Sequence, residues 1–372
     1  MTRGKIALLM FLSLAGLAIG SGCWQKARLQ AWWNVRELAR SGDNTRERHA
    51  RALADLGESA VGPLLGGMAN DDETVCRNLE MGLRTVIGAW AVDDSRTVQA
   101  MEALRASFGS CSLEGRMALL RFAAAFANQR DDFVLPARIA RSLGELVETS
   151  EAVAELRPAA LGLAGALVEH GSTGQWQSMC RNLAIKWLAD PNAATRVAAI
   201  QIVLREPLRK DAELLARLAP CLHDAEANVR RVALVALGTN TEVVREEQLL
   251  PLLHDGDAEV QRLCEAVLRS RGLNEMHIRM ARLISHEDAA VRMQVIPLLR
   301  QARDLDADVW VRRLTLDPAP AVRAAAARLA SVDPSDDLRL RLAEMARVDP
   351  SPTVREIARF YVERSNVRQA GN

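Results

Sequence analysis

Aromatic residues and lysine are scarce in this sequence. Aromatics make up 4% of the 372 residues, with a single tyrosine, whereas the hydrophobic share reaches 49%. Small and aliphatic residues therefore dominate, a bias that suits close-packed helices. Lysine occurs only four times, and the 48 basic residues nearly balance the 47 acidic ones. A dedicated nucleic-acid binder usually carries a strong basic excess, so we expect no nucleic-acid partner.

Motifs of known catalytic chemistry are also missing. No phosphate loop, dinucleotide fingerprint or nucleophile elbow occurs, and the string that begins at His286 lacks the second histidine of a zinc-protease helix. The six cysteines are spaced too widely for a metal knuckle. Cys221 and Cys264 are expected to be buried apolar residues, while Cys76 and Cys111 could be free or bridged. The sequence predicts no enzyme activity, no cofactor and no metal site.

The amino terminus has the three parts of an export signal. Arg3 and Lys5 precede an apolar stretch over residues 6–20, and small residues follow it. A membrane-spanning helix needs roughly 20 apolar residues, so this stretch is short for an anchor. We therefore expect residues 1–22 to form a signal segment and the protein to be exported.

The cleavage site has three interpretations. Ser21-Gly22-Cys23 resembles a bacterial lipobox, although Gly20 stands where that motif usually has leucine. Lipidation of Cys23 is the preferred prediction, and it would anchor the protein in the cell-envelope membrane on the periplasmic side. Ordinary cleavage after Gly20 and an uncleaved anchor are the alternatives.

A repeated turn-and-helix pattern is the strongest signal in the chain. It begins at residues 190, 224, 255, 286, 317 and 349, and a Val or Thr follows five positions later at residues 195, 229, 260, 291, 322 and 354. Apolar residues dominate at offsets of 5, 8, 9, 12 and 13 from each start, which is the stripe of an amphipathic helix. A second helix precedes each turn, as over residues 212–222. Each period therefore contains two helices and two turns.

These units resemble HEAT repeats, particularly the short bacterial type related to bilin-lyase repeats. The resemblance is clear over residues 189–364 and weak over 48–90, where Cys76 stands in place of the expected arginine. It implies an all-α fold, an α-solenoid of stacked antiparallel helix pairs. Residues 23–188 would form a helical region in which 93–188 lack the motif, and 365–372 a disordered tail.

The resemblance also implies a ladder in which turn aspartates and motif arginines join neighbouring units. The aspartates would be Asp190, Asp224, Asp255, Asp317 and Asp349, and the arginines Arg196, Arg230, Arg292, Arg323 and Arg355. Gln261 and His286 interrupt this series, which leaves their junctions open.

Architecture and missing motifs together predict a non-enzymatic scaffold of the bacterial cell envelope. Its partner would be another protein, held on the inner face of the helical stack. Offsets of 7 and 14 lie outside the apolar stripe, and there the middle units carry four candidate partner-binding residues, which stacking would gather into one basic patch: Arg231, Arg262, Arg269 and Arg300. The alternative is a bilin-lyase-like or other enzyme-associated HEAT protein.

Overall fold

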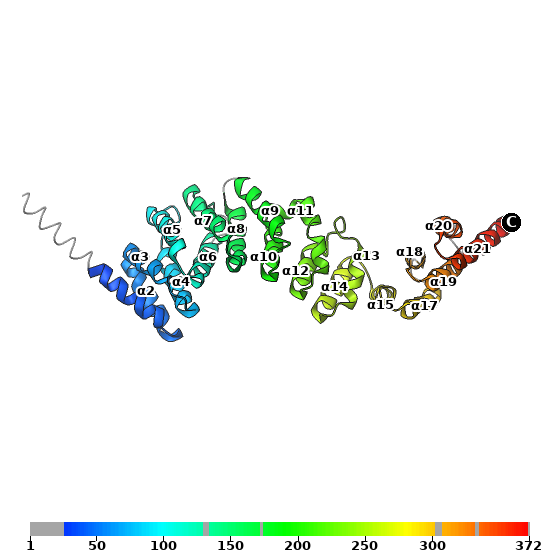
Figure 1. Ribbon diagram of the computed structural model, residues 1–372, viewed down its shortest axis with the longest axis horizontal. Helices are drawn as coiled ribbons and strands as arrows, with labels where there is room; N and C mark the ends of the chain where they lie inside the picture. The colour runs from blue at the N-terminus through cyan, green and yellow to red at the C-terminus, as the bar shows by residue number, and fades with distance from the viewer. Residues whose placement is uncertain (1–25, 129–133, 172–173, 302–306, 332–334, 371–372) are drawn as a thin grey trace, which may run out of the picture. The chain divides into compact units, whose positions relative to one another are not determined.

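The computed structural model describes residues 26–128, 134–171, 174–301, 307–331 and 335–370. These residues are predominantly helical (Figure 1) and contain no β-strand; among them an isolated bridge joins Leu135 to Gly171. The prediction of an all-α, solenoid-like fold is therefore confirmed. The expected signal segment and Cys23 lie outside the described residues. The chain divides into two compact units, residues 1–232 and 233–372.

The first unit is built from two rows of helices. In one row each helix packs against the next: α2 (Asp43–Leu56), α4 (Glu73–Gly88), α6 (Leu113–Ala127), α8 (Arg157–His170) and α10 (Ala193–Val203). The other helices are α3 (Val61–Gly67), α5 (Ser95–Ser107), α7 (Ala137–Ser150), α9 (Gly174–Trp187) and α11 (Ala212–Ala216). A helix over residues 26–40 precedes α2, and α12 (Ala227–Leu237) continues into the second unit.

Short 3-10 turns join several of these helices: η1 (Gly57–Ala60), η2 (Phe108–Ser110), η3 (Ala154–Leu156), η4 (Leu208–Lys210) and η5 (Ala219–His223). Residues 93–188, which lack the sequence motif, contribute α5 to α9 to the same two rows. There Ser112 caps α6 by accepting from the N–H of Gly115 (2.9 Å), and its hydroxyl donates to the Asn70 carbonyl of the preceding turn (2.6 Å). Side chains outside the motif thus also connect successive turns.

The second unit also has two rows of helices. One row contains α14 (Ala258–Ser270), α16 (Ala289–Met293), α17 (Val295–Gln301), α19 (Pro320–Ala330) and α21 (Pro352–Ala370). The other contains α13 (Glu246–Leu249) with η6 (Leu250–His254), α15 (Glu275–Ile284), α18 (Ala307–Leu314) and α20 (Asp336–Val348). The break between α16 and α17 falls at Gln294, because Pro297 lacks an N–H and in an unbroken helix its ring would collide with the carbonyl of Met293.

The last helix is longer than the sequence indicates. α21 continues to Ala370, whereas the repeat pattern ends near residue 364 and a disordered tail is expected from residue 365. Residues 365–370 are helical in the structure.

The apolar stripe of the motif forms the core, as predicted. Val260, Cys264 and Leu268 on α14 are fully buried, at offsets of 5, 9 and 13 from the turn residue. Val229 and Leu237 occupy the first and last of these places on α12 and are buried too. In these two repeats the apolar stripe thus packs into the core.

Candidate functional site

In the part of the chain that the structure describes, motif arginines reach from one turn to the next at Arg196, Arg292 and Arg323. In the first unit, Arg196 donates through Nε and Nη2 to the carboxylate of Asp224, at 2.8 and 2.6 Å. Its Nη1 donates to the carbonyl oxygen of Asp190, 2.8 Å away, which closes its own turn. Two further pairs have the same form in the second unit: Arg292 with Asp317, and Arg323 with Asp349. The implied ladder is therefore present at these places.

The ladder extends one turn further towards the amino terminus than the sequence analysis placed it. Arg157 donates to the carboxylate of Asp190 (2.7 Å) and to the carbonyl oxygen of Glu151 (3.0 Å), six residues before it. Glu151 replaces the turn aspartate, yet Leu156 and Arg157 follow at the motif offsets of 5 and 6. Those offsets are the signal that could have revealed this turn.

The contact six residues back survives where arginine is replaced. The thiol of Cys76 donates to the carbonyl oxygen of Asn70 (3.1 Å), and Nε2 of Gln261 donates to that of Asp255 (2.6 Å). A donor at this position closes the turn whatever its charge. The arginine is required only for the second function, which is to reach the next turn.

A pair of histidines occupies the junction where the ladder motif is interrupted in the second unit. The rings of His254 and His286 meet edge to face with centroids 5.3 Å apart. Nε2 of His254 lies 2.8 Å from the carbonyl oxygen of Arg282, and Nδ1 of His286 accepts from the N–H of Asp288 (3.0 Å). His286 thereby accepts the hydrogen bond within the turn that an aspartate accepts in other turns, as Asp190 does from the N–H of Asn192.

Turn aspartates and helix caps are separate residues. Asp190 accepts a hydrogen bond from the N–H of Asn192 (2.8 Å), and Asn192 in turn caps α10 by accepting from the N–H of Ala194 (2.8 Å). The structure assigns the aspartate to the turn and the cap to the residue two positions later.

The four candidate arginines are placed as follows. Arg262 and Arg269 lie on α14, where Arg262 pairs with Glu259 (2.8 Å) and Arg269 with both Glu265 and Glu275 (3.1 Å each). Arg231, in the first unit, is half-buried, with Asn228 Oδ1 3.4 Å from its Nη2. Arg300 belongs to α17, but its side chain is outside the described part of the structure. The charges of Arg262 and Arg269 are balanced by neighbouring carboxylates, and their part in partner binding stays a prediction.

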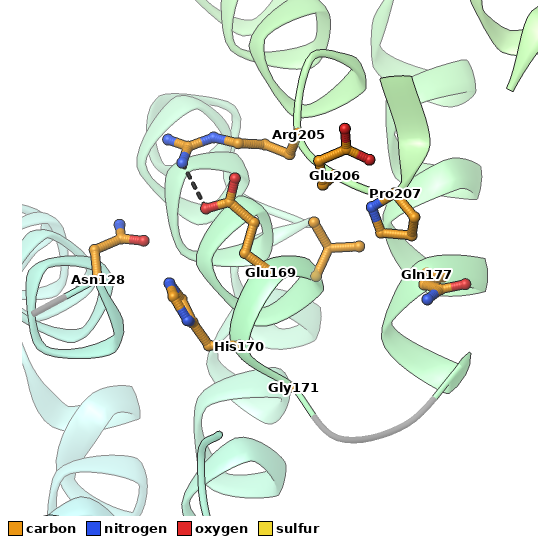
Figure 2. Close-up of a pocket in the computed structure, with 9 residues that line it drawn as sticks. Asn128, Glu169, His170, Gly171, Gln177, Arg205, Glu206 and Pro207 are labelled. Carbon is orange, nitrogen blue, oxygen red and sulfur yellow. Dashed lines mark hydrogen bonds and ion pairs between the residues drawn. The ribbon is translucent and has the colours of Figure 1, made fainter. Parts of the chain in front are cut away.

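A polar groove opens at the carboxyl-terminal ends of α6, α8 and α10 (Figure 2). It is a hollow of about 850 Å3 within the first unit, and we use the name polar groove for its lining: Asn128, Val168, Glu169, His170, Gly171, Gln177, Arg205, Glu206 and Pro207. Residues at the points where the chain leaves each helix line the groove. Asn128 follows α6, His170 ends α8 and Arg205 follows α10. The groove therefore crosses three successive helices of one row.

The charged side chains of the polar groove are paired, one of them with a residue of another repeat. Arg205 donates to Glu169 (2.7 Å), which joins the turn after α10 to the end of α8 (Figure 2). Glu206 pairs with Arg209 and with Lys210. Asn128 and Gln177 are exposed, and each offers both a donor and an acceptor. No sequence pattern indicates this set, because its members do not share an offset in the repeat.

Reactive or metal-binding groups do not gather within the described residues. No group of three or more His, Cys, Asp or Glu side chains there is arranged to hold a metal ion. Cys76, Cys111, Cys180, Cys221 and Cys264 are all free and buried. Burial raises the pKa of the Cys180 and Cys264 thiols to about 12.

Over the part of the chain that the structure describes, no helix is both long and apolar enough to cross a membrane. Comparison with known proteins gives no further assignment: no protein-family model matches this chain, and no curated protein does.

Proposed function

We propose that this protein is a non-enzymatic scaffold that holds an extended segment of another protein in the polar groove. The observation that supports this proposal is the position of the groove across the ends of α6, α8 and α10. A hollow that crosses several repeats suits a long ligand, and repeat proteins bind other proteins on such extended surfaces.

The lining favours hydrogen bonding over apolar contact. Asn128, Gln177 and His170 supply donors and acceptors at separate points, and the Arg205–Glu169 pair offers a charge of each sign. A partner carboxylate would bind Arg205 in competition with Glu169, and charge-assisted hydrogen bonds of this kind are among the stronger polar contacts. The partner segment is therefore polar, with an acidic residue opposite Arg205.

The proposal locates the protein in the bacterial cell envelope, exported and anchored through a lipid on Cys23. The lipobox-like Ser21-Gly22-Cys23 supports the anchor, and the Asp–Arg contacts between successive turns support the resemblance to HEAT repeats. The mass of the intact protein after detergent extraction tests the anchor. An unmodified amino terminus at Ser21 would contradict it.

A charge swap tests the groove. Arg205→Glu combined with Glu169→Arg keeps an ion pair between the turn after α10 and the end of α8 but reverses the charges that a partner meets. The matched control swaps Arg105 and Glu145, a pair of similar length (2.8 Å) between α5 and α7 that lies outside the groove. We expect affinity capture from the membrane fraction to lose its partner with the groove swap and keep it with the control swap.

A photo-crosslinking residue at Gln177 gives a second readout. We expect it to form a covalent adduct with the captured partner, identified by mass spectrometry of the cross-linked peptide. If both swaps retain the same partner and Gln177 gives no adduct, the groove is not the binding surface.

A further inference from the structure

Tryptophan is concentrated at the start of the described chain. Of seven tryptophans, three fall within residues 24–33. The described two, Trp32 and Trp33, are 57% and 54% exposed, and Leu29 beside them is 71% exposed. Tryptophan is highly buried on average, so two adjacent exposed rings are unusual. They indicate that another molecule covers this surface.

The helix over residues 26–40 has two distinct faces. Its inner face packs into the first unit through Ala31, Val35 and Leu38, which are buried. Its outer face, called the tryptophan face from here on, consists of exposed residues at helical spacing: Leu29, Trp32, Trp33, Arg36 and Arg40. Apolar residues occupy the end of this face nearer the amino terminus, and arginines follow them.

Charge on this helix is one-sided. The helix carries four basic residues, Lys26, Arg28, Arg36 and Arg40, and one acidic residue, Glu37. The whole chain, in contrast, has 48 basic against 47 acidic residues. The guanidinium of Arg36 lies 5.7 Å from the centre of the Trp32 ring. Beside the ring, a hollow of about 420 Å3 is lined by Arg28, Leu29, Trp32 and Pro63, which carries the surface onto α3. An apolar surface with a basic edge suits an amphipathic, negatively charged occupant.

We propose that the tryptophan face lies against a bilayer surface that contains anionic lipids. Leu29, Trp32 and Trp33 enter the interfacial layer, where tryptophan is enriched, and the basic side chains bind lipid phosphates. This inference rests on the membrane anchor of the proposed function. From Cys23 to Trp32 the chain spans at most about 20 Å, at about 3.6 Å per extended residue and 1.5 Å per helical residue. A lipid on Cys23 therefore keeps the face close to the membrane, and a second contact makes anchoring by lipid more stable.

Quenching by brominated lipids tests the proposal on the full-length chain. Every variant carries Trp24→Phe, so that the ring next to Cys23 gives no signal. The parent is reconstituted in phosphatidylcholine vesicles with or without phosphatidylglycerol, and bromine on the acyl chains quenches nearby tryptophan. We expect the parent to be quenched, more so with the anionic lipid. Trp32→Phe with Trp33→Phe should abolish most of that quenching.

Two controls make the result specific. Trp90→Phe with Trp187→Phe removes two buried rings and should leave the quenching in place. Arg36→Glu with Arg40→Glu should remove the advantage of the anionic vesicles. Circular dichroism melting curves establish that each variant is folded.

The remaining outcomes overturn the proposal in distinguishable ways. If the chain binds vesicles but Trp32 and Trp33 are quenched by aqueous iodide and not by the brominated lipid, the face is not at the membrane and the anchor stands. Shielding from both quenchers together with a dimeric mass in detergent assigns the face to a second copy of the chain. A chain that does not bind vesicles at all overturns the anchor and this inference together.

Discussion

The guanidinium of Arg323 meets the carboxylate of Asp349 through two hydrogen bonds of 2.9 Å, and both side chains are more than nine-tenths buried. The remaining nitrogen, Nη1, donates back to the carbonyl oxygens of Asp317 and Pro318. One side chain thus closes its own turn and holds the next. For a buried ion pair, the free energy at stake is mainly the penalty of leaving one charge without its partner.

Arg323→Ala should lower the free energy of unfolding by about 3–5 kcal/mol, because it leaves Asp349 buried and unpaired. Arg355 is the matched control. It makes the same contact six residues back, to the carbonyl oxygen of Asp349 (2.6 Å), but within the described residues it meets no carboxylate of a later turn. Arg355→Ala should cost only about 1–2 kcal/mol. Urea unfolding followed by circular dichroism measures both, and equal losses would contradict the two-part role of Arg323.

The same pair predicts loss of stability in acid. Burial alone would raise the pKa of Asp349, but hydrogen bonds from Arg323 and from the Ser351 N–H lower it on balance. Since its folded-state pKa is below the unfolded value of about 3.9, its contribution is complete above that pH and is lost as the pH falls through the folded-state pKa. The melting temperature should therefore fall more steeply below about pH 4 in the wild type than in Asp349→Asn. Parallel curves would argue against this contribution.

Two glycines should respond to alanine with opposite signs. A Cβ at Gly115 would lie 1.9 Å from the carbonyl oxygen of Met68, a backbone atom that already accepts from the N–H of Ser112. Gly115→Ala must push α6 away from the end of α3, at a cost of about 1–3 kcal/mol or more. A Cβ at Gly162 in α8 meets nothing within 4 Å, so Gly162→Ala should stabilise the helix by about 0.5–1 kcal/mol. Thermal melts decide this, and a stabilised Gly115→Ala would refute the close approach.

Cys180 and Cys264 should resist alkylation in the native protein. Burial raises the pKa of each thiol to about 12, so very little thiolate forms near neutral pH. Each thiol also donates to a backbone carbonyl oxygen, that of Ala164 (3.1 Å) or Leu249 (3.2 Å). Iodoacetamide labelling, read by peptide mass spectrometry, should modify both only after unfolding in urea. Native labelling as fast as in urea would show that the thiols are accessible.

The periodic part of the fold is predictable because one kind of residue recurs at one offset. Val229 and Val260 are buried as their place in the motif requires, and Cys264 behaves as the small apolar residue that its offset indicates. The Arg157–Asp190 pair was missed, because Glu151 replaces the turn aspartate and Leu156 replaces the valine. A search by offset and residue class, rather than by identity, recovers that turn.

The polar groove could not be predicted in this way. Asn128, His170 and Arg205 are neighbours because three helices end at the same edge of one row, and their positions in the sequence follow no period. Helix length decides which residue reaches the edge, and lengths depend on packing and on prolines such as Pro297. The tryptophan face could not be predicted for another reason. Hydrophobic periodicity identifies the buried side of a helix and gives no information about its exposed side.

The contact between one turn and the next also bears on how such a chain can grow. Each ladder arginine pairs with the turn aspartate of the following turn. Residues 318–349 contain one ladder arginine, Arg323, and one turn aspartate, Asp349. A tandem copy of this 32-residue segment after Asp349 would pair its own arginine with its own aspartate, and would present the same turn to Arg355. Duplication of this one segment would therefore lengthen the protein while every ladder arginine in it keeps an aspartate in the following turn.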